Sequence, residues 1–183
     1  PTGTVTIDNT TPTQGQTLTA SNNLDDEDGI GTISYQWSRD GTAISGATAD
    51  TYTLVQADVG YAITVKASYT DAKGTSESVT SSPTGAVTNV DDAGVVTISG
   101  TAREDEVLTT TVTDIDGITG AITYQWTRGG TAISGATADT YTLVQADVGS
   151  TITVTASYTD AISLNTESVT SSPTGAVTNV DDA

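Results

Sequence analysis

The chain has 183 residues, of which 23 are Asp or Glu and only five are Lys or Arg, so its formal net charge is −18. Such a charge repels nucleic acid and anionic membrane surfaces, and we expect cations as partners instead. The absence of His and Cys excludes the commonest general base, thiol nucleophiles, disulfide bonds and the usual zinc ligands. We therefore expect a protein that is not an enzyme, does not insert into a membrane and binds its ligands through oxygen atoms.

The sequence consists of two copies of one module, offset by 89 to 90 residues. The identical blocks pair Thr42–Gly60 with Thr131–Gly149 and Glu77–Ala93 with Glu167–Ala183. Identity that covers surface positions as well as core positions indicates tandem duplication. We expect a first repeat over 1–90, an acidic linker over 91–94 and a second repeat over 95–183, all belonging to a longer tandem array.

Repeat 1 alternates apolar and polar residues with a period of two, which is typical of half-buried strands. The clearest case is 32–38, where Ile33, Tyr35 and Trp37 share one face. Asp40-Gly41 then predicts a hairpin turn. In chain order we expect strands over 4–7, 16–21, 32–38, 42–44, 51–55 and 61–70, with a tight turn over 56–60 and a last strand that runs from about Val79 through Pro83 towards Val87.

Repeat 2 follows the same pattern, with expected strands over 96–98, 107–111, 122–126, 141–143, 151–159 and 168–177. Short strands without a long helical period predict an all-β fold of two tandem immunoglobulin-like antiparallel Greek-key β-sandwiches arranged end to end. We expect Trp37 and Trp126 in the two cores. Because the usual immunoglobulin cysteines are missing, aliphatic residues such as Ile63 and Ile152 should fill that part of the core.

Acidic residues gather where this topology brings loops together. In such a sandwich the N-terminus lies at the same end as the loops after the second and sixth strands, so the linker should meet those loops of repeat 2. The candidate ligands at this junction are Asp91, Asp92, Asp114, Asp116 and Asp160, with Asp58 added from the tight turn of repeat 1. Converging carboxylates repel one another unless a cation lies between them, and oxygen ligands favour Ca²⁺. The alternative is that these acidic loops are simply solvated.

Repeat 1 carries an equivalent acidic cluster, but its own preceding linker lies outside the sequence. Its candidate ligands, a weaker set, are Asp25, Asp26, Glu27, Asp28 and Asp71. Conversely, Asp181 and Asp182 form a second copy of the linker with no loops after it, and we expect them to be disordered or incompletely liganded.

The residues also carry a family resemblance. Both repeats contain Tyr-Thr-Leu-Val-Gln-Ala-Asp-Val-Gly, Ala-Ser-Tyr-Thr-Asp and Glu-Ser-Val-Thr-Ser. These strings resemble the Ig-like extender repeats of giant bacterial surface adhesins of the RTX, type I secretion class. The Asp-Asp linker resembles that of cadherin-like repeats, without their additional Asn and Pro. The resemblance implies an extracellular stalk module on a bacterial cell surface, stiffened by calcium, that is monomeric and contacts neighbouring repeats of its own chain.

The alternative from another class is an Ig-like module that binds a glycan or a protein partner through a sheet face or its loops. The two repeats are nearly identical, and we expect no exposed aromatic cluster. Both points favour the stalk.

Overall fold

The computed structural model describes residues 1–181. The chain divides into two compact units, Pro1–Val90 and Asp91–Ala183, so the expected linker residues 91–94 belong to the second unit. Within the described part of the chain, no helix has both the length and the apolar character needed to cross a membrane.

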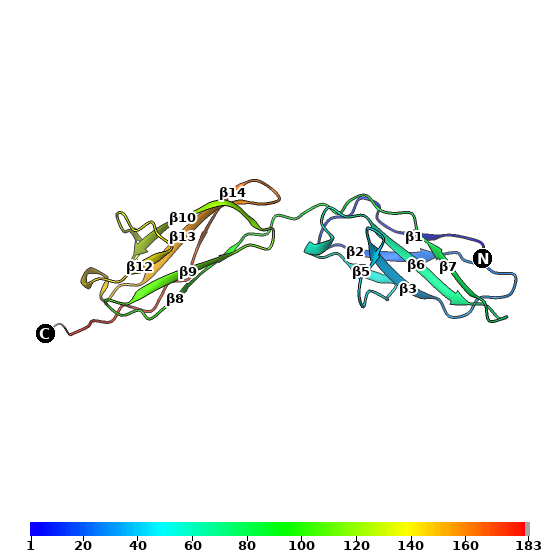
Figure 1. Ribbon diagram of the computed structural model, residues 1–183, viewed down its shortest axis with the longest axis horizontal. Coiled ribbons are helices and arrows are strands. Elements are labelled where there is room, and N and C mark those ends of the chain that lie inside the picture. The colour runs from blue at the N-terminus through cyan, green and yellow to red at the C-terminus, as the bar shows by residue number, and fades with distance from the viewer. Residues whose placement is uncertain (182–183) are drawn as a thin grey trace. The chain divides into compact units, whose positions relative to one another are not determined.

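Unit 1 is built from two antiparallel sheets (Figure 1). One sheet has the strand order β1-β2-β5 and the other β4-β3-β6-β7. The elements are β1 (Val5–Ile7), β2 (Thr17–Asn22), β3 (Ser34–Arg39), β4 (Thr42–Ala43), β5 (Thr51–Thr53), the 3₁₀ turn η1 (Gln56–Asp58), β6 (Ile63–Thr70) and β7 (Ser76–Thr80). The expected tight turn over 56–60 therefore contains η1.

Unit 2 repeats this order, with sheets β12-β9-β8 and β11-β10-β13-β14. Its elements are β8 (Val95–Ser99), β9 (Val107–Thr113), β10 (Ile118–Arg128), β11 (Thr131–Ala132), β12 (Thr140–Thr142), η2 (Gln145–Asp147), β13 (Ile152–Asp160) and β14 (Thr166–Thr170). Both units are immunoglobulin-like antiparallel β-sandwiches, so the predicted all-β sandwich fold of each repeat is confirmed.

Each core is centred on a tryptophan, as predicted. Trp37 and Trp126 are both 0% exposed, and each indole packs against a tyrosine ring, Tyr52 in unit 1 and Tyr141 in unit 2. The indole N–H groups donate 2.9 Å hydrogen bonds to backbone carbonyls, which satisfies the one polar atom that this burial removes from water. Ile63 and Ile152 are also fully buried. Aliphatic side chains therefore fill this part of each core, as expected for a chain without cysteines.

The last strand of each unit is shorter than predicted. In unit 1 it ends at Thr80, because in the following segment the β6 amides donate to side-chain hydroxyls and not to backbone carbonyls, although Ser81 and Thr84 still donate their own amides to β6. Ser81 Oγ accepts from the Val65 amide at 3.1 Å and Thr84 Oγ1 from the Ile63 amide at 3.0 Å. Pro83, which has no N–H, lies between them. In this segment the buried residues Ser81, Thr84 and Val87 recur at every third position, unlike the period of two of a regular strand.

Strand β10 starts earlier than the predicted 122–126. It begins at Ile118, and its register with β13 shifts between Thr119 and Thr123. Gly120 lies inside this irregularity with a φ of +75°, a conformation that glycine adopts without steric cost. The bulge carries β10 up to the loop that contains the acidic residues of unit 2.

Candidate metal centre

Unit 2 brings acidic side chains together in two overlapping groups. The first is Asp91, Asp116 and Asp160, and the second is Asp114, Asp160 and Glu167; in each, one oxygen per residue lies within 4.8 Å of the others. Asp160 is the last residue of β13, and Glu167 lies in β14. Asp114 and Asp116 come from the β9–β10 loop, and Asp91 precedes β8. All five of these acidic residues belong to unit 2.

Two of these carboxylates are buried and have an oxygen without a partner. Asp160 is 0% exposed and Asp116 is 4% exposed. Asp160 Oδ2 and Asp116 Oδ1 have no hydrogen-bond donor within the described residues. A buried carboxylate oxygen without a donor is costly, because it has lost its hydration and gained nothing in return. A bound cation would supply the missing interaction, and oxygen-only ligands suit Ca²⁺.

The other oxygen of Asp160 is held by the β13–β14 hairpin. Asp160 Oδ1 accepts from the Ile162 amide at 2.9 Å and from the Ser163 amide. Burial by itself would raise the pKa of Asp160, but the hydrogen bonds from the Ser163 amide and hydroxyl and from the Ile162 and Ala161 amides outweigh it and hold that pKa below its ordinary value. The carboxylate is therefore anionic at neutral pH, with Oδ2 still available.

The segment before β8 is held against the same loop. The Asp92 amide donates to Asp116 Oδ2 at 2.8 Å, and the Asp116 amide donates to Asp114 Oδ1 at 2.8 Å. Asp92, expected as a carboxylate ligand, thus contacts the cluster through its backbone, and neither group within residues 1–181 includes its side chain.

Gly94 allows this segment to approach so closely. A Cβ at this buried position would overlap the Tyr158 hydroxyl oxygen and lie 2.9 Å from the Thr113 carbonyl oxygen. The Gly94 amide instead donates to Glu167 Oε2 at 3.2 Å.

Glu167 and Tyr158 were not predicted as part of the site. The Tyr158 hydroxyl lies 2.6 Å from Asp114 Oδ2 and 2.8 Å from Glu167 Oε2. Burial, followed by the hydrogen bonds to these carboxylates, raises the pKa of Tyr158 well above its ordinary value. The feature that could have identified these two residues is the register of the β13–β14 hairpin, in which Tyr158 is opposite Glu167. A hairpin register assigned from the sequence would have placed the two side chains on the same face.

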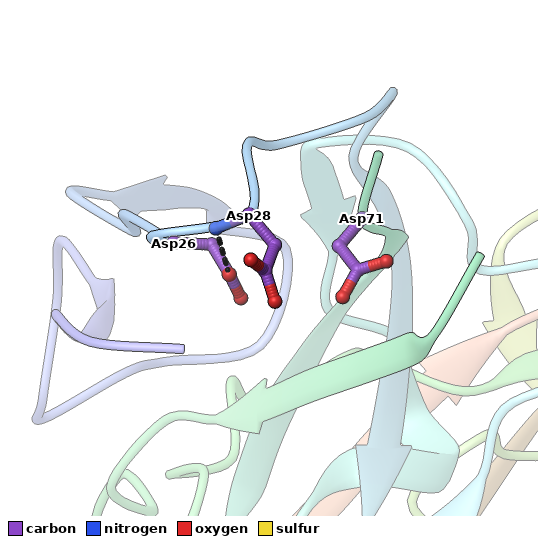
Figure 2. Close-up of side chains that lie close together, drawn as sticks. All are labelled: Asp26, Asp28 and Asp71. Atoms are coloured by element: carbon purple, nitrogen blue, oxygen red, sulfur yellow. Dashed lines mark hydrogen bonds between the residues drawn. The ribbon is translucent and has the colours of Figure 1, made fainter. Parts of the chain in front are cut away.

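Unit 1 carries the equivalent group Asp26, Asp28 and Asp71, again with oxygens within 4.8 Å of one another. Figure 2 shows the three carboxylates pointing towards one another, two from the β2–β3 loop and Asp71 from the end of β6. The Asp28 amide donates to Asp26 Oδ1 at 3.0 Å (Figure 2), and the Tyr69 hydroxyl donates to Asp26 Oδ2 at 2.8 Å. The Asp28 amide bond, followed by that from Tyr69, lowers the pKa of Asp26, and burial followed by the Asp26 contact raises the pKa of Tyr69 to about 12.

A cationic side chain of unit 1 already pairs with this cluster. Lys73 Nζ lies 2.5 Å from Asp28 Oδ1. Asp25 and Glu27, also expected as ligands, are exposed and are not part of this group. Asp25 Oδ1 instead accepts from the Asp26 amide at 2.9 Å.

Asp58, expected as a ligand from the tight turn, has other partners in unit 1. It is 0% exposed, and its oxygens accept from Arg39, from the Tyr52 hydroxyl and from the Val55 amide. Its carboxylate is therefore engaged in holding η1 against the sandwich. In the second copy of the linker, Asp181 is exposed, and Asp182 lies outside the described residues.

No protein-family model matches the chain, and no curated protein matches it in sequence. Solved structures resemble it distantly. Three N-terminal domains of the bacteriophage RB49 highly immunogenic outer capsid protein (Hoc) are 21% identical, with 93% of this chain and 58% of that one covered and a TM-score of 0.35. The full ectodomain of mouse nectin-like molecule 4 is 14% identical, with 99% and 65% covered and a TM-score of 0.40.

A third similar structure is a Ca²⁺-stabilised adhesin with which an Antarctic bacterium binds ice. It is 20% identical, with 98% of this chain and 49% of that one covered and a TM-score of 0.32. This chain therefore spans less than two thirds of each of these three structures. None of these likenesses is close enough to transfer a function.

Proposed function

We propose that the chain is a structural extender module of a large bacterial cell-surface adhesin, in which calcium stabilises the second unit. The observation that carries this proposal is the pair of buried, unpartnered oxygens, Asp160 Oδ2 and Asp116 Oδ1, in a group that includes Asp91. These three residues would hold the ion. The ion would supply positive charge and direct coordination to oxygens that otherwise have no partner.

Calcium at this place would also restrain the chain where the units join. In unit 1 the Val90 amide donates to Gln14 Oε1 at 3.2 Å, and in unit 2 the Asp92 amide donates to Asp116 Oδ2 at 2.8 Å. Asp91 is the one residue between these two amides in the sequence. An ion that binds the Asp91 carboxylate restricts that residue, which would otherwise act as a charged, flexible connection.

An extracellular location follows from the same proposal. Calcium binds the assembled loops and not the extended chain, so it adds stability only where the free calcium concentration is high enough. Extracellular calcium modules bind with dissociation constants on the order of 10⁻⁴ to 10⁻³ M. Such sites fill outside a cell and empty in the cytosol, and the chain would then gain its full stability after secretion.

The alternative ligand-binding function receives less support. A glycan platform usually needs a cluster of exposed aromatic rings. Both tryptophans are fully buried, and among the described residues Tyr61, at 46% exposure, is the one exposed aromatic side chain. Saturable binding of the chain on a glycan array would favour this alternative.

The proposal is tested by small-angle X-ray scattering and thermal unfolding of the chain in calcium and then in EGTA. We expect calcium to raise the melting temperature and to make the maximum dimension larger and better defined. Asp91→Asn should reduce the effect on dimension and leave both units folded, whereas Asp139→Asn, which removes an equal charge from an exposed loop, should behave as wild type. Identical scattering and melting in calcium and EGTA would refute calcium stabilisation.

A further inference from the structure

We infer that unit 2 binds two calcium ions rather than one, and that Asp160 is a shared ligand of both. One position is formed by Asp91, Asp116 and Asp160, and the other by Asp114, Asp160 and Glu167. This inference rests on the calcium binding proposed above and specifies its stoichiometry and ligands.

The carboxylates form two groups and not one. Within each group of three the ligand oxygens lie within 4.8 Å of one another, which is the largest separation that two oxygens about 2.4 Å from one ion can have. Across residues 1–181, only Asp160 is a member of both groups. A single ion contacting all five side chains would require the two groups to merge.

The charge of the cluster also favours more than one divalent ion. Five carboxylates carry a formal charge of −5, so one calcium leaves −3 and two leave −1. Asp160 and Asp116 are buried, and like charges that are shielded from water repel more strongly than exposed ones. A second ion brings the cluster close to neutrality.

The second position has its own signs of missing positive charge. The Tyr158 hydroxyl is within hydrogen-bond distance of both Asp114 Oδ2 and Glu167 Oε2, at 2.6 and 2.8 Å. A hydroxyl has one proton, so it cannot donate a well-aligned bond to both carboxylates at once. Asp160, the third member of this group, has a buried oxygen, Oδ2, that receives no donor. Glu167 Oε2 also accepts from the Gly94 amide, so the three acceptor oxygens of Asp114, Glu167 and Asp160 share two protons, one from Tyr158 and one from Gly94.

Unit 1 provides an internal comparison. Its group contains Asp26, Asp28 and Asp71, the counterparts of Asp114, Asp116 and Asp160, and does not include Glu77, the counterpart of Glu167. Lys73 already pairs with Asp28, and the corresponding residue of unit 2 is Ile162. None of the buried unpartnered oxygens in the described chain belongs to the unit 1 group. The two-ion arrangement is therefore a property of unit 2.

Calcium counting on the 183-residue chain tests the inference, by isothermal titration and by native mass spectrometry with calcium as the only added metal. We expect Asp160→Asn to bind two fewer ions than wild type. The double variant Asp114→Asn/Glu167→Gln should bind one fewer, and Glu77→Gln should match wild type. Asn and Gln keep the side-chain shape and can still hydrogen bond with Tyr158, and intrinsic tryptophan fluorescence checks that each variant is folded.

The outcomes separate this inference from the proposed function. If the double variant keeps the wild-type count while Asp160→Asn loses one ion, unit 2 has a single position and the inference is wrong, while calcium stabilisation stands. Loss of one ion in both variants means one ion shared by all the side chains and also overturns it. If no variant changes the count, the proposed function fails as well. Should Asp160→Asn not fold, the triple variant Asp91→Asn/Asp114→Asn/Glu167→Gln, which retains Asp160 and alters both groups, takes its place. We expect it to lose two ions, and a loss of one would overturn the inference.

Discussion

The guanidinium of Arg39 donates to the fully buried carboxylate of Asp58, with Nε and a terminal nitrogen both 2.7 Å from Oδ1. The other oxygen, Oδ2, accepts from the Tyr52 hydroxyl at 2.9 Å and from the Val55 amide at 2.8 Å. Arg128 and Asp147 repeat the pair in unit 2, with an Nε–Oδ1 distance of 2.6 Å. The pair joins η1 to β3 in one unit and η2 to β10 in the other.

Removal of this carboxylate should destabilise unit 1 strongly. Asp58→Ala leaves Arg39 without its partner and the Val55 amide without an acceptor, and breaking a buried ion pair costs about 3–5 kcal/mol. Because Arg39 is partly exposed and can be hydrated, we expect about 3 kcal/mol. Urea unfolding measures the change. Asp50→Ala, at an exposed position, is the control and should have little effect on unfolding; equal stability of the two variants would contradict a structural role for Asp58.

The Ser81 hydroxyl oxygen accepts the Val65 amide bond in place of a backbone carbonyl, and its contribution to stability should also be measurable. Ser81→Ala removes the acceptor of the buried Val65 amide, and an unsatisfied buried donor costs about 1–3 kcal/mol. We expect a decrease of that size in the free energy of unfolding, together with faster hydrogen exchange at Val65. Ser82→Ala, on the exposed neighbour, should leave both unchanged. Slow exchange at Val65 in Ser81→Ala would mean that another acceptor takes over.

A methyl group at Gly94 should displace the segment that precedes β8. The new Cβ would overlap the Tyr158 hydroxyl and crowd Asp114 Oδ2, which lies 3.0 Å away. Because Asp91 is in the same segment, we expect Gly94→Ala to weaken calcium binding at least tenfold, which is about 1.4 kcal/mol. Titration calorimetry measures the affinity. Gly175→Ala is the matched control, because a Cβ there meets no atom within 4 Å. Wild-type affinity in Gly94→Ala would show that the segment can bind the ion from elsewhere.

Transfer of the unit 1 lysine should reduce the calcium requirement of unit 2. Ile162→Lys places a cation at the position from which Lys73 reaches Asp28, and a charge near the cluster competes with Ca²⁺. We expect calcium affinity to fall about fivefold to tenfold, and the melting temperature in EGTA to rise. Ile162→Gln is polar without the charge and should match wild type. If Lys and Gln variants have the same affinity at low salt, the lysine does not act as a cation at this site.

Much of the fold could be predicted because its signals are local. Period-two alternation identified the strand with Trp37, and glycine-containing turns separated the strands. The exact ends of the strands could not be predicted as well. Ser81, Thr84 and Val87 are buried at every third position, and the hydroxyl oxygens of Ser81 and Thr84 accept from amides of β6. These bonds depend on a partner strand that the residues of this segment do not identify.

The candidate site shows the same division. The sequence by itself determined the repeat, the sandwich topology and the supply of oxygen ligands without His or Cys. Only the tertiary structure decided which carboxylates converge: it engages Asp58 with Arg39, adds Glu167 beside Asp114 and buries Asp160 with an unpartnered oxygen. The reason is that an acidic residue in a loop has the same letter whether it is solvated, paired or buried. Its environment comes from strands and loops that are distant in the chain and meet only in the folded unit.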